Sequence, residues 1–238
     1  MGTGATMKAY LDLCRVSNLP TVWTNVLAAC VLAEGRFHAD TLFLLTASLS
    51  CFYLAGMALN DLCDREHDRL NRPSRPIPSG RIEVRDARIF ILLLFAAGFI
   101  ILAFAPYKRA EFAAILLFAA IVAYDQHHKQ KPLSVLLMAS CRFLVFAIAA
   151  LAIAGWLPAA VILAGCVQFS YIVVLSLMAR YENNRPRPFP FPVIPAMLAG
   201  ISLLDGILLA SLAKPCWLVA GVGGFLLTVA GQRYVRGD

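Results

Sequence analysis

The chain has 238 residues, of which 60% are apolar and 15% charged, with a net charge of +7 and a mean hydropathy of +0.73. Soluble domains carry about 25% charged residues, so this composition excludes an ordinary water-soluble enzyme, a disordered chain and a nucleic-acid binder with a fully basic face. An all-α polytopic membrane protein remains. A bilayer core about 30 Å thick takes about 20 apolar residues per helix, which allows roughly seven to nine spans.

Eight membrane spans are predicted, each bounded by proline, glycine or a charge cluster. The polar residues before them contain no signal-peptide cleavage site. No linker, clear repeat or soluble insertion separates the spans, so residues 1–238 are treated as a single transmembrane domain. In chain order, the spans are 18–34, 41–60, 88–106, 110–124, 132–155, 158–179, 191–213 and 215–232.

Lysine and arginine are distributed unevenly between the connecting segments. Sixteen lie in one alternate set, which contains both termini and the long connection after the second span, and four lie in the other set. By the positive-inside rule, both termini and the basic connections face the cytoplasm, and we expect a bacterial inner membrane. The basic surplus suits anionic lipid headgroups or an anionic substrate, so no nucleic-acid partner is expected.

Four polar residues follow the second predicted span: Asn60, Asp61, Asp64 and Asp68. On a helix the three aspartates, at positions i, i+3 and i+7, lie along one stripe. Asn60 lies beside them, and we expect it to position the first carboxylates at the substrate site. Three like charges are tolerated there if a divalent cation lies between them, and oxygen ligands favour Mg²⁺, with Mn²⁺ as the alternative. The other interpretation is a solvated acidic helix end at the membrane boundary.

The segment 69–81 comes directly after these aspartates. Its prolines and glycine stiffen a loop that presents four arginines, among them Arg72 and Arg75. Guanidinium groups match phosphate oxygens in a bidentate way. An acidic metal site followed by a rigid basic loop therefore indicates a diphosphate bound through magnesium, and topology control is the alternative explanation for the arginines.

The run NDLCDREHDRLNRPSRPIPSGRI resembles the NDxxDxxxD signature and RPxPSG loop of the UbiA superfamily of intramembrane prenyltransferases. The likeness extends weakly from RVSNLPTVWTNVLAA to LMASCR. It implies a helical bundle around a central cavity, and aspartates 61, 64 and 68 holding Mg²⁺. It also implies ionisation of an isoprenyl diphosphate, whose allylic cation a small aromatic or polar-lipid acceptor captures. Relatives typically have nine helices, and short bacterial EboC-like members fit this length best.

The resemblance implies further site residues near the ends of the fourth and sixth spans. Tyr124 and Lys129 resemble a Tyr/Lys element, although the spacing is longer than usual; we expect Lys129 to contact phosphate and Asp125 to orient it or a ligand water. The second DxxxD motif of the superfamily is missing. The segment MARYENNRPRP occupies its place. A second metal would then use Glu182 together with Asn183 or Asn184, or Asp125, and the alternative is that the second metal is absent.

Two charged residues and one amide lie inside predicted spans. A charge within hydrocarbon needs a partner or a wet cavity. We expect Arg142 to face the cavity and the phosphates, and Asp205 to pair with a buried base or a polar helix face. Asn25 is expected either to line the cavity and contact substrate or to form a hydrogen bond between helices.

Three functions fit this sequence. The leading one is Mg²⁺-dependent transfer of an isoprenyl group to a small acceptor within the membrane, with isoprenyl diphosphate, acceptor and membrane lipids as partners. A UbiA-type terpene cyclase would act on prenyl diphosphate without an acceptor. A non-catalytic binder of prenyl diphosphate or lipid would keep the fold and lack the second metal site.

Overall fold

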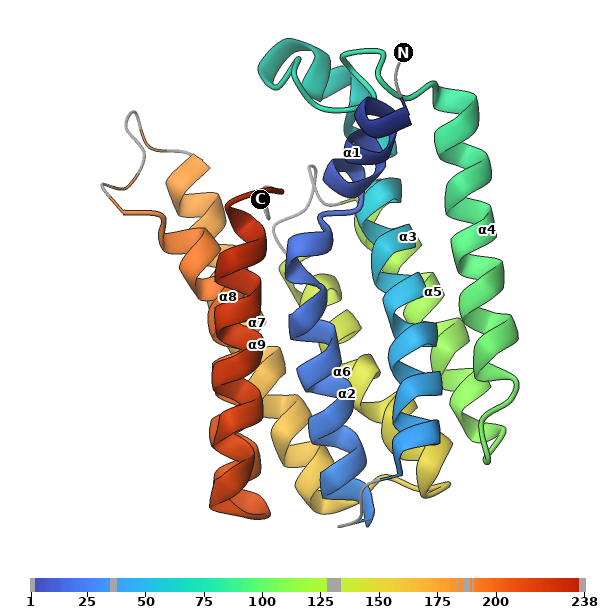
Figure 1. Ribbon diagram of the computed structural model, residues 1–238, viewed down its shortest axis with the longest axis vertical. Coiled ribbons are helices and arrows are strands. Elements are labelled where there is room, and N and C mark those ends of the chain that lie inside the picture. The colour runs from blue at the N-terminus through green and yellow to red at the C-terminus, as the bar shows by residue number, and fades with distance from the viewer. Residues whose placement is uncertain are drawn as a thin grey trace.

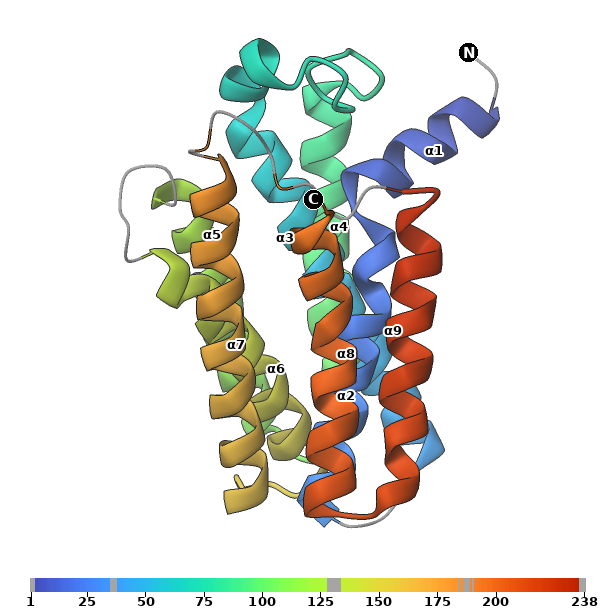
Figure 2. The same ribbon diagram turned by 90° about the vertical axis from the view of Figure 1, so that its left-hand side faces the viewer.

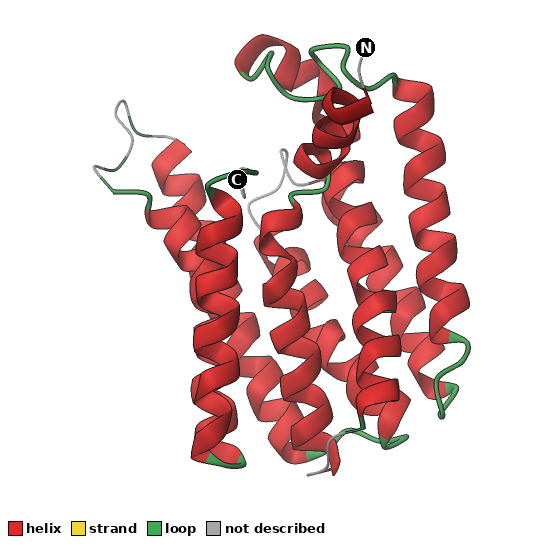
Figure 3. Cartoon of the chain, viewed as in Figure 1, coloured by secondary structure: helices red, strands yellow, loops and turns green. Residues whose placement is uncertain are grey.

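The computed structural model describes residues 3–34, 38–127, 134–183, 185, 189 and 191–235. Every regular element in these ranges is a helix, as the colouring in Figure 3 shows. The elements are α1 (Thr3–Leu13), η1 (Val16–Asn18), α2 (Leu19–Glu34), α3 (Ala39–Asn71), α4 (Val84–Leu102), α5 (Arg109–His127), α6 (Ser134–Ile153), α7 (Ala159–Asn183), α8 (Val193–Leu212), η2 (Pro215–Trp217) and α9 (Leu218–Gln232).

The helices α2 to α9 run side by side as one bundle, and α1 lies obliquely at one of its ends (Figures 1 and 2). Both chain termini and the connection between α3 and α4 lie at that same end, which we call the basic end because Lys8 of α1, the arginines 72, 75 and 81 of this connection, and Arg233 after α9 lie there. The all-α fold is therefore as predicted, and the alternation of connections between the two ends agrees with the predicted order of spans.

Six segments of the described chain are long and apolar enough to cross a membrane, so the protein is a multi-pass integral membrane protein. They are Val16–Glu34, Ala39–Asn71, Ser134–Ile153, Ala159–Glu182, Val193–Leu212 and Pro215–Gln232. Helices α4 and α5 overlap the other two predicted spans but are not among these six segments; α4, for example, has three charged residues in its first turns, Arg85, Asp86 and Arg88. The count of eight spans stays a prediction.

Helix α2 is the centre of the bundle. It packs against α3, α6, α7, α8 and α9, and much of its surface is buried, including the small residues Ala28 and Ala29. Small side chains let neighbouring backbones approach closely within a membrane. The same principle joins α8 to α9, because a Cβ atom on Gly206 would lie only 2.7 Å from the Cα atom of Gly221.

Helix α3 is longer than its predicted span. Its 33 residues correspond to about 50 Å at 1.5 Å per residue, whereas the hydrocarbon core is about 30 Å thick. The last turns therefore extend beyond the core at the basic end. The helix ends at Asn71 because Pro73 disfavours helical backbone at the residue before it.

The connection after α3, residues 72–83, is folded into tight turns. The amide of Ile82 donates to the carbonyl of Pro76 at 3.1 Å, and the amide of Ser79 donates to the carbonyl of Arg75 at 3.0 Å. The side chains of Pro76, Ile77 and Ile82 are buried. The predicted stiff loop is thus present, although it starts at Arg72 because the helix continues through Arg69 to Asn71.

Candidate functional site

Two aspartates at the end of α3 share one arginine. Asp61 and Asp68 are each 3% exposed and lie two helical turns apart on the same face. The Nη1 atom of Arg75 donates to Asp61 Oδ1 at 3.1 Å and to Asp68 Oδ2 at 2.6 Å. Arg15 Nη2 donates to the same Asp61 oxygen at 3.0 Å. Two carboxylates and two guanidinium groups therefore form one compact, nearly neutral cluster.

Arg15 is a site residue that the sequence analysis missed. It follows α1 and has φ 46° and ψ 49°, the only positive φ of a non-glycine residue in the described part of the chain. This left-handed conformation costs about 1 to 2 kcal/mol, and such strain concentrates at functional sites. In the sequence, Arg15 resembles an ordinary charge before a membrane span. The contact with Asp61 depends on a turn that composition does not predict.

Two of the three predicted magnesium ligands, Asp61 and Asp68, direct their oxygens at one point. Among the described residues no three His, Cys, Asp or Glu side chains are grouped so as to hold a metal. Asp64 is partly exposed and acts electrostatically on Tyr124 of α5. Asp61 and Asp68, however, direct oxygens at one positively charged nitrogen, and Mg²⁺ in proteins often has one or two carboxylate ligands with phosphate and water completing its shell.

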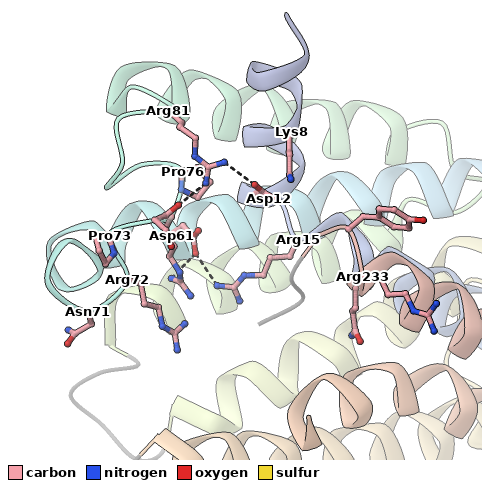
Figure 4. A pocket seen from close by; sticks show the side chains of 14 residues that line it. Lys8, Asp12, Arg15, Asp61, Asn71, Arg72, Pro73, Pro76, Arg81 and Arg233 are labelled. Atoms are coloured by element: carbon pink, nitrogen blue, oxygen red, sulfur yellow. Dashed lines mark hydrogen bonds and ion pairs between the residues drawn. The ribbon is translucent and has the colours of Figure 1, made fainter. Parts of the chain in front are cut away.

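A polar pocket of about 720 Å³ lies beside this cluster at the basic end (Figure 4). Arg72 and Arg75 line it, as the phosphate-binding prediction for the loop requires. Arg81 Nη1 donates to Asp12 Oδ2 of α1 at 3.0 Å, which ties the loop to α1. The pocket is lined by Lys8, Asp12, Arg15, Asp61, Asn71, Arg72, Pro73, Ser74, Arg75, Pro76, Arg81, Gln232, Arg233 and Tyr234.

An apolar cavity of about 120 Å³ lies between the helices, and the residues Val22, Phe52, Ile121 and Leu175 are typical of its lining. Four polar side chains also line it: Tyr53, Tyr124, Asp125 and Arg142. Tyr53 lies at the boundary between cavity and polar pocket, since its hydroxyl donates to the carbonyl of Arg15 at 3.5 Å. A ligand with a charged head and a hydrocarbon tail would fit this arrangement, with its head in the polar pocket and its tail in the apolar cavity.

Asn60 has a different partner from the one expected. Its Nδ2 atom donates to Asp125 Oδ1 of α5 at 3.0 Å, so it does not position the first aspartates. One residue along a helix turns a side chain by about 100°, which directs Asn60 toward α5 and Asp61 toward Arg15. Asp125 is buried in the cavity wall beside Tyr124.

Arg142 faces the cavity, as predicted, and its guanidinium group forms hydrogen bonds with side chains of α2. Its Nη1 donates to Asn25 Oδ1 at 2.6 Å, and its Nη2 donates to Thr21 Oγ1 at 2.9 Å. Asn25 is fully buried and is not among the residues that line the cavity. Of its two predicted roles, the structure therefore shows the hydrogen bond between helices. Asn25 Nδ2 in turn donates to Asp205 Oδ2 at 2.7 Å.

Asp205 lies against polar side chains of neighbouring helices, which is one of the two environments expected for it. Its carboxylate accepts from Thr24 Oγ1 and from Gln168 Nε2, each at 2.7 Å, in addition to Asn25. The network joins α2, α6, α7 and α8 around one buried negative charge. Thr24 and Gln168 were missed because uncharged polar residues in apolar helices give no sign of their partners.

Two predicted site residues remain, Lys129 and Glu182. Lys129 lies outside the described residues. Glu182 Oε1 accepts from the backbone amide of Phe189 at 3.1 Å, across the turn that follows α7. Near it, Arg180 donates to Ser134 at 2.7 Å and acts electrostatically on Tyr124. In the described chain, Glu182 thus belongs to a loop contact and to no group of metal-ligating side chains.

Comparison with known proteins agrees with this architecture. The model of the UbiA prenyltransferase family matches residues 20–235. A digeranylgeranylglyceryl phosphate synthase of Sulfolobus acidocaldarius is 37% identical over 115 residues, which cover 47% of this chain and 42% of the relative. The corresponding synthase of Methanococcus vannielii is 33% identical over 167 residues, covering 69% of this chain and 59% of the relative. The chain thus spans about half the length of these curated relatives.

Solved structures have the same fold. A UbiA homologue from Archaeoglobus fulgidus bound to DMAPP and Mg²⁺ superposes with a TM-score of 0.63 at 19% identity, covering 93% of this chain and 86% of that one. A structure of a digeranylgeranylglyceryl phosphate synthase gives a TM-score of 0.62 at 20% identity, covering 96% and 87%. At this level of identity, the likeness establishes the fold.

Proposed function

The chain belongs to the UbiA prenyltransferase family, and we propose that it transfers a prenyl group from an isoprenyl diphosphate to a polar-lipid acceptor that carries a glyceryl phosphate group. The main support is the juxtaposition of the Asp61, Asp68 and Arg75 cluster with an apolar cavity deeper in the bundle. The names of the relatives favour the lipid acceptor over an aromatic one.

In this proposal Asp61 and Asp68 hold Mg²⁺, Asp64 acts at the edge of the site, and Mn²⁺ is an alternative ion. Bound Mg²⁺ would neutralise negative charge on the departing diphosphate. Arg72 and Arg75 contact the phosphate oxygens, and Lys129 keeps its predicted phosphate contact.

The residues of the chain would act mainly by electrostatics and by excluding water. As the carbon–oxygen bond of the donor breaks, negative charge develops on the diphosphate, and guanidinium groups already in place stabilise it without reorganisation. Arg15 is such a group, because its ion pair with Asp61 holds it at the edge of the polar pocket. The apolar cavity lining keeps water from the allylic cation until the acceptor captures it.

We further propose that the basic end faces the cytoplasm. Both termini and the connection between α3 and α4 lie there together, and lysine and arginine favour the cytoplasmic side of membranes. The bacterial inner membrane remains a prediction, and the two relatives named above are archaeal.

Turnover by the purified protein in lipid nanodiscs tests this function. Pyrophosphate release from geranylgeranyl diphosphate should require both a divalent metal and the acceptor. Asp61→Asn and Asp68→Asn should lower kcat/KM by about 100-fold or more, as expected for lost electrostatic stabilisation of a transition state. The exposed Asp86, at the same end of the bundle, provides the control Asp86→Asn.

Other outcomes distinguish the remaining functions. Full activity in both aspartate variants would contradict the proposed site. A hydrocarbon product formed without acceptor would identify a terpene cyclase, and metal-dependent binding of the donor without turnover would identify a non-catalytic binder.

A further inference from the structure

The polar pocket at the basic end carries more positive charge than its carboxylates neutralise. Arg15 and Arg75 are paired with Asp61, and Arg81 is paired with Asp12. Six of the residues that line the pocket are basic and two are acidic: Lys8, Arg15, Arg72, Arg75, Arg81 and Arg233 against Asp12 and Asp61.

Three of these cations form no ion pair with any residue that the structure describes: Lys8, Arg72 and Arg233. They come from three separate places in the chain, namely α1, the connection after α3, and the residue after α9. All three side chains are exposed, yet they line one pocket of about 720 Å³. The fold thus gathers positive charge that the described chain leaves uncompensated.

The three cations are not all on the same side of the aspartates. In Figure 4, Arg72 lies on one side of Asp61, whereas Lys8 and Arg233 lie on the other side, beyond Arg15. A diphosphate held at Asp61 with Arg72 and Arg75 therefore leaves Lys8 and Arg233 available for a second anion.

The backbone around Lys8 and Arg233 is anchored. In α1 the neighbours Ala9 and Leu13 are fully buried. At the other chain end, Gln232 Nε2 donates to Asn18 Oδ1 at 3.2 Å and to the carbonyl of Pro195 at 3.1 Å. These contacts hold the backbone that carries both cations at the edge of the pocket.

We propose that Lys8 and Arg233 bind the phosphate of the acceptor lipid, so that donor and acceptor occupy opposite ends of one pocket. This inference rests on the proposed function and extends it to a location for the acceptor headgroup. Basic pockets at the cytoplasmic ends of membrane helices suit phosphate headgroups. A headgroup at Arg233 would place its hydrocarbon chains beside α9, whose span is only 17% buried within the protein.

Binding and kinetics of the double variant Lys8→Gln/Arg233→Gln test the proposal. The probes are dioctanoyl phosphatidic acid, dioctanoylglycerol without phosphate, and inorganic phosphate, each titrated into protein in detergent. Loss of two charged hydrogen-bond donors should raise the Kd for phosphatidic acid and the KM for the acceptor about 10-fold or more, and leave the donor KM unchanged. The control is Arg88→Gln, at an exposed position of the same end outside the pocket.

Each result has a defined meaning. Unaltered phosphatidic acid binding in the double variant, an increase in the donor KM instead of the acceptor KM, or inorganic phosphate binding as tightly as the lipid would overturn the inference. Recovery of affinity in Lys8→Arg/Arg233→Lys, together with an unchanged Tm, would support a charge effect over misfolding. Wild-type protein that binds phosphatidic acid through these residues but shows no transfer would overturn the proposed function and leave this site intact.

Discussion

Asp205 accepts a hydrogen bond of 2.7 Å from Asn25 Nδ2, and this contact fixes which way the Asn25 amide faces. A carboxylate can only accept, so Asn25 must direct its NH₂ group at Asp205 and its oxygen at Arg142. Arg142 donates to that oxygen at 2.6 Å. Asp205 therefore orients the asparagine that holds the cavity-facing arginine, and its charge balances that arginine across the amide.

Substitution of Asp205 should reveal this arrangement. Asp205→Leu leaves Arg142 without its balancing charge and removes the acceptor that Asn25 Nδ2 uses, so we expect a loss of about 3 to 5 kcal/mol in the free energy of unfolding. Asp205→Asn should cost less, because Gln168 can turn its amide and use Oε1, which has no hydrogen-bond partner among the described residues. Denaturation in detergent measures both, and equal losses would contradict the orienting role.

Because of Arg75, the thermal stability of the wild-type protein should depend little on bound metal. It neutralises Asp61 and Asp68 when no ion is bound, so a chelator should abolish the proposed transfer while changing Tm little. In Arg75→Gln the two carboxylates repel, and Mg²⁺ should then raise Tm more than it does in the wild type, because a ligand of the native state stabilises it. Thermal unfolding with and without Mg²⁺ provides the comparison. An equal Mg²⁺ effect in both proteins would mean that the ion binds elsewhere.

Glu182→Gln distinguishes a loop contact from a second metal site. The amide oxygen can still accept from the backbone amide of Phe189, so we expect activity within about twofold of wild type, as for an ordinary surface substitution. A large loss of kcat with the melting temperature unchanged would show that the negative charge itself is needed, and a second ion at Glu182 would then be the explanation.

The thiol of Cys14, in the turn after α1, should be unreactive. Burial, together with the nearby Asp61 charge, raises its pKa from 9.0 to about 12. At about pH 8 the thiolate fraction is then roughly 1 in 10,000. The neutral thiol stabilises the fold below about pH 9, and this contribution is lost as the pH rises toward the folded pKa. Iodoacetamide mapping should label the exposed Cys63 and spare Cys14 until the protein unfolds.

Gly56 should limit the length of the prenyl donor. It lines the apolar cavity, and a Cβ atom there would lie 3.3 Å from Ile121 Cγ2. A cavity of about 120 Å³ holds only part of a long chain, given that ligand pockets usually measure about 300 to 1,000 Å³. Gly56→Leu should therefore lower kcat/KM more for geranylgeranyl diphosphate than for dimethylallyl diphosphate.

Gly223→Leu is the matched control for the cavity. A Cβ atom at Gly223 on α9 meets nothing within 4 Å, so this variant should leave donor selectivity unchanged. Similar changes in selectivity at both positions would indicate a general effect on packing instead of a shorter cavity.

Local patterns were enough to predict the helices and part of the site. Apolar runs predicted the positions of α2 to α9, because membrane helices satisfy their backbone groups internally and need only length and hydropathy. Helical spacing also placed Asp61 and Asp68 on one face. The same spacing included Asp64, which is partly exposed and acts electrostatically on Tyr124 of α5.

The missed parts of the site depend on contacts between distant segments. Arg15 contacts Asp61 because of a left-handed turn, and Gln168 of α7 contacts Asp205 of α8. Neither contact has a signal in the local sequence. Asn60 was assigned to its neighbours in sequence, yet its partner is Asp125, 65 residues away. In helices that are apolar all round, periodicity does not fix which face meets which neighbour.

The short connections opposite the basic end affect how this chain enters a membrane. Helices α4 and α5, α6 and α7, and α8 and α9 are each joined there by only a few residues, which include Lys108 and Lys214 and no acidic residue. Carrying a charge through hydrocarbon costs about 2.5 to 3.5 kcal/mol on the insertion scale. With the basic end on the cytoplasmic side, as proposed above, each of these helical hairpins has little charge to translocate.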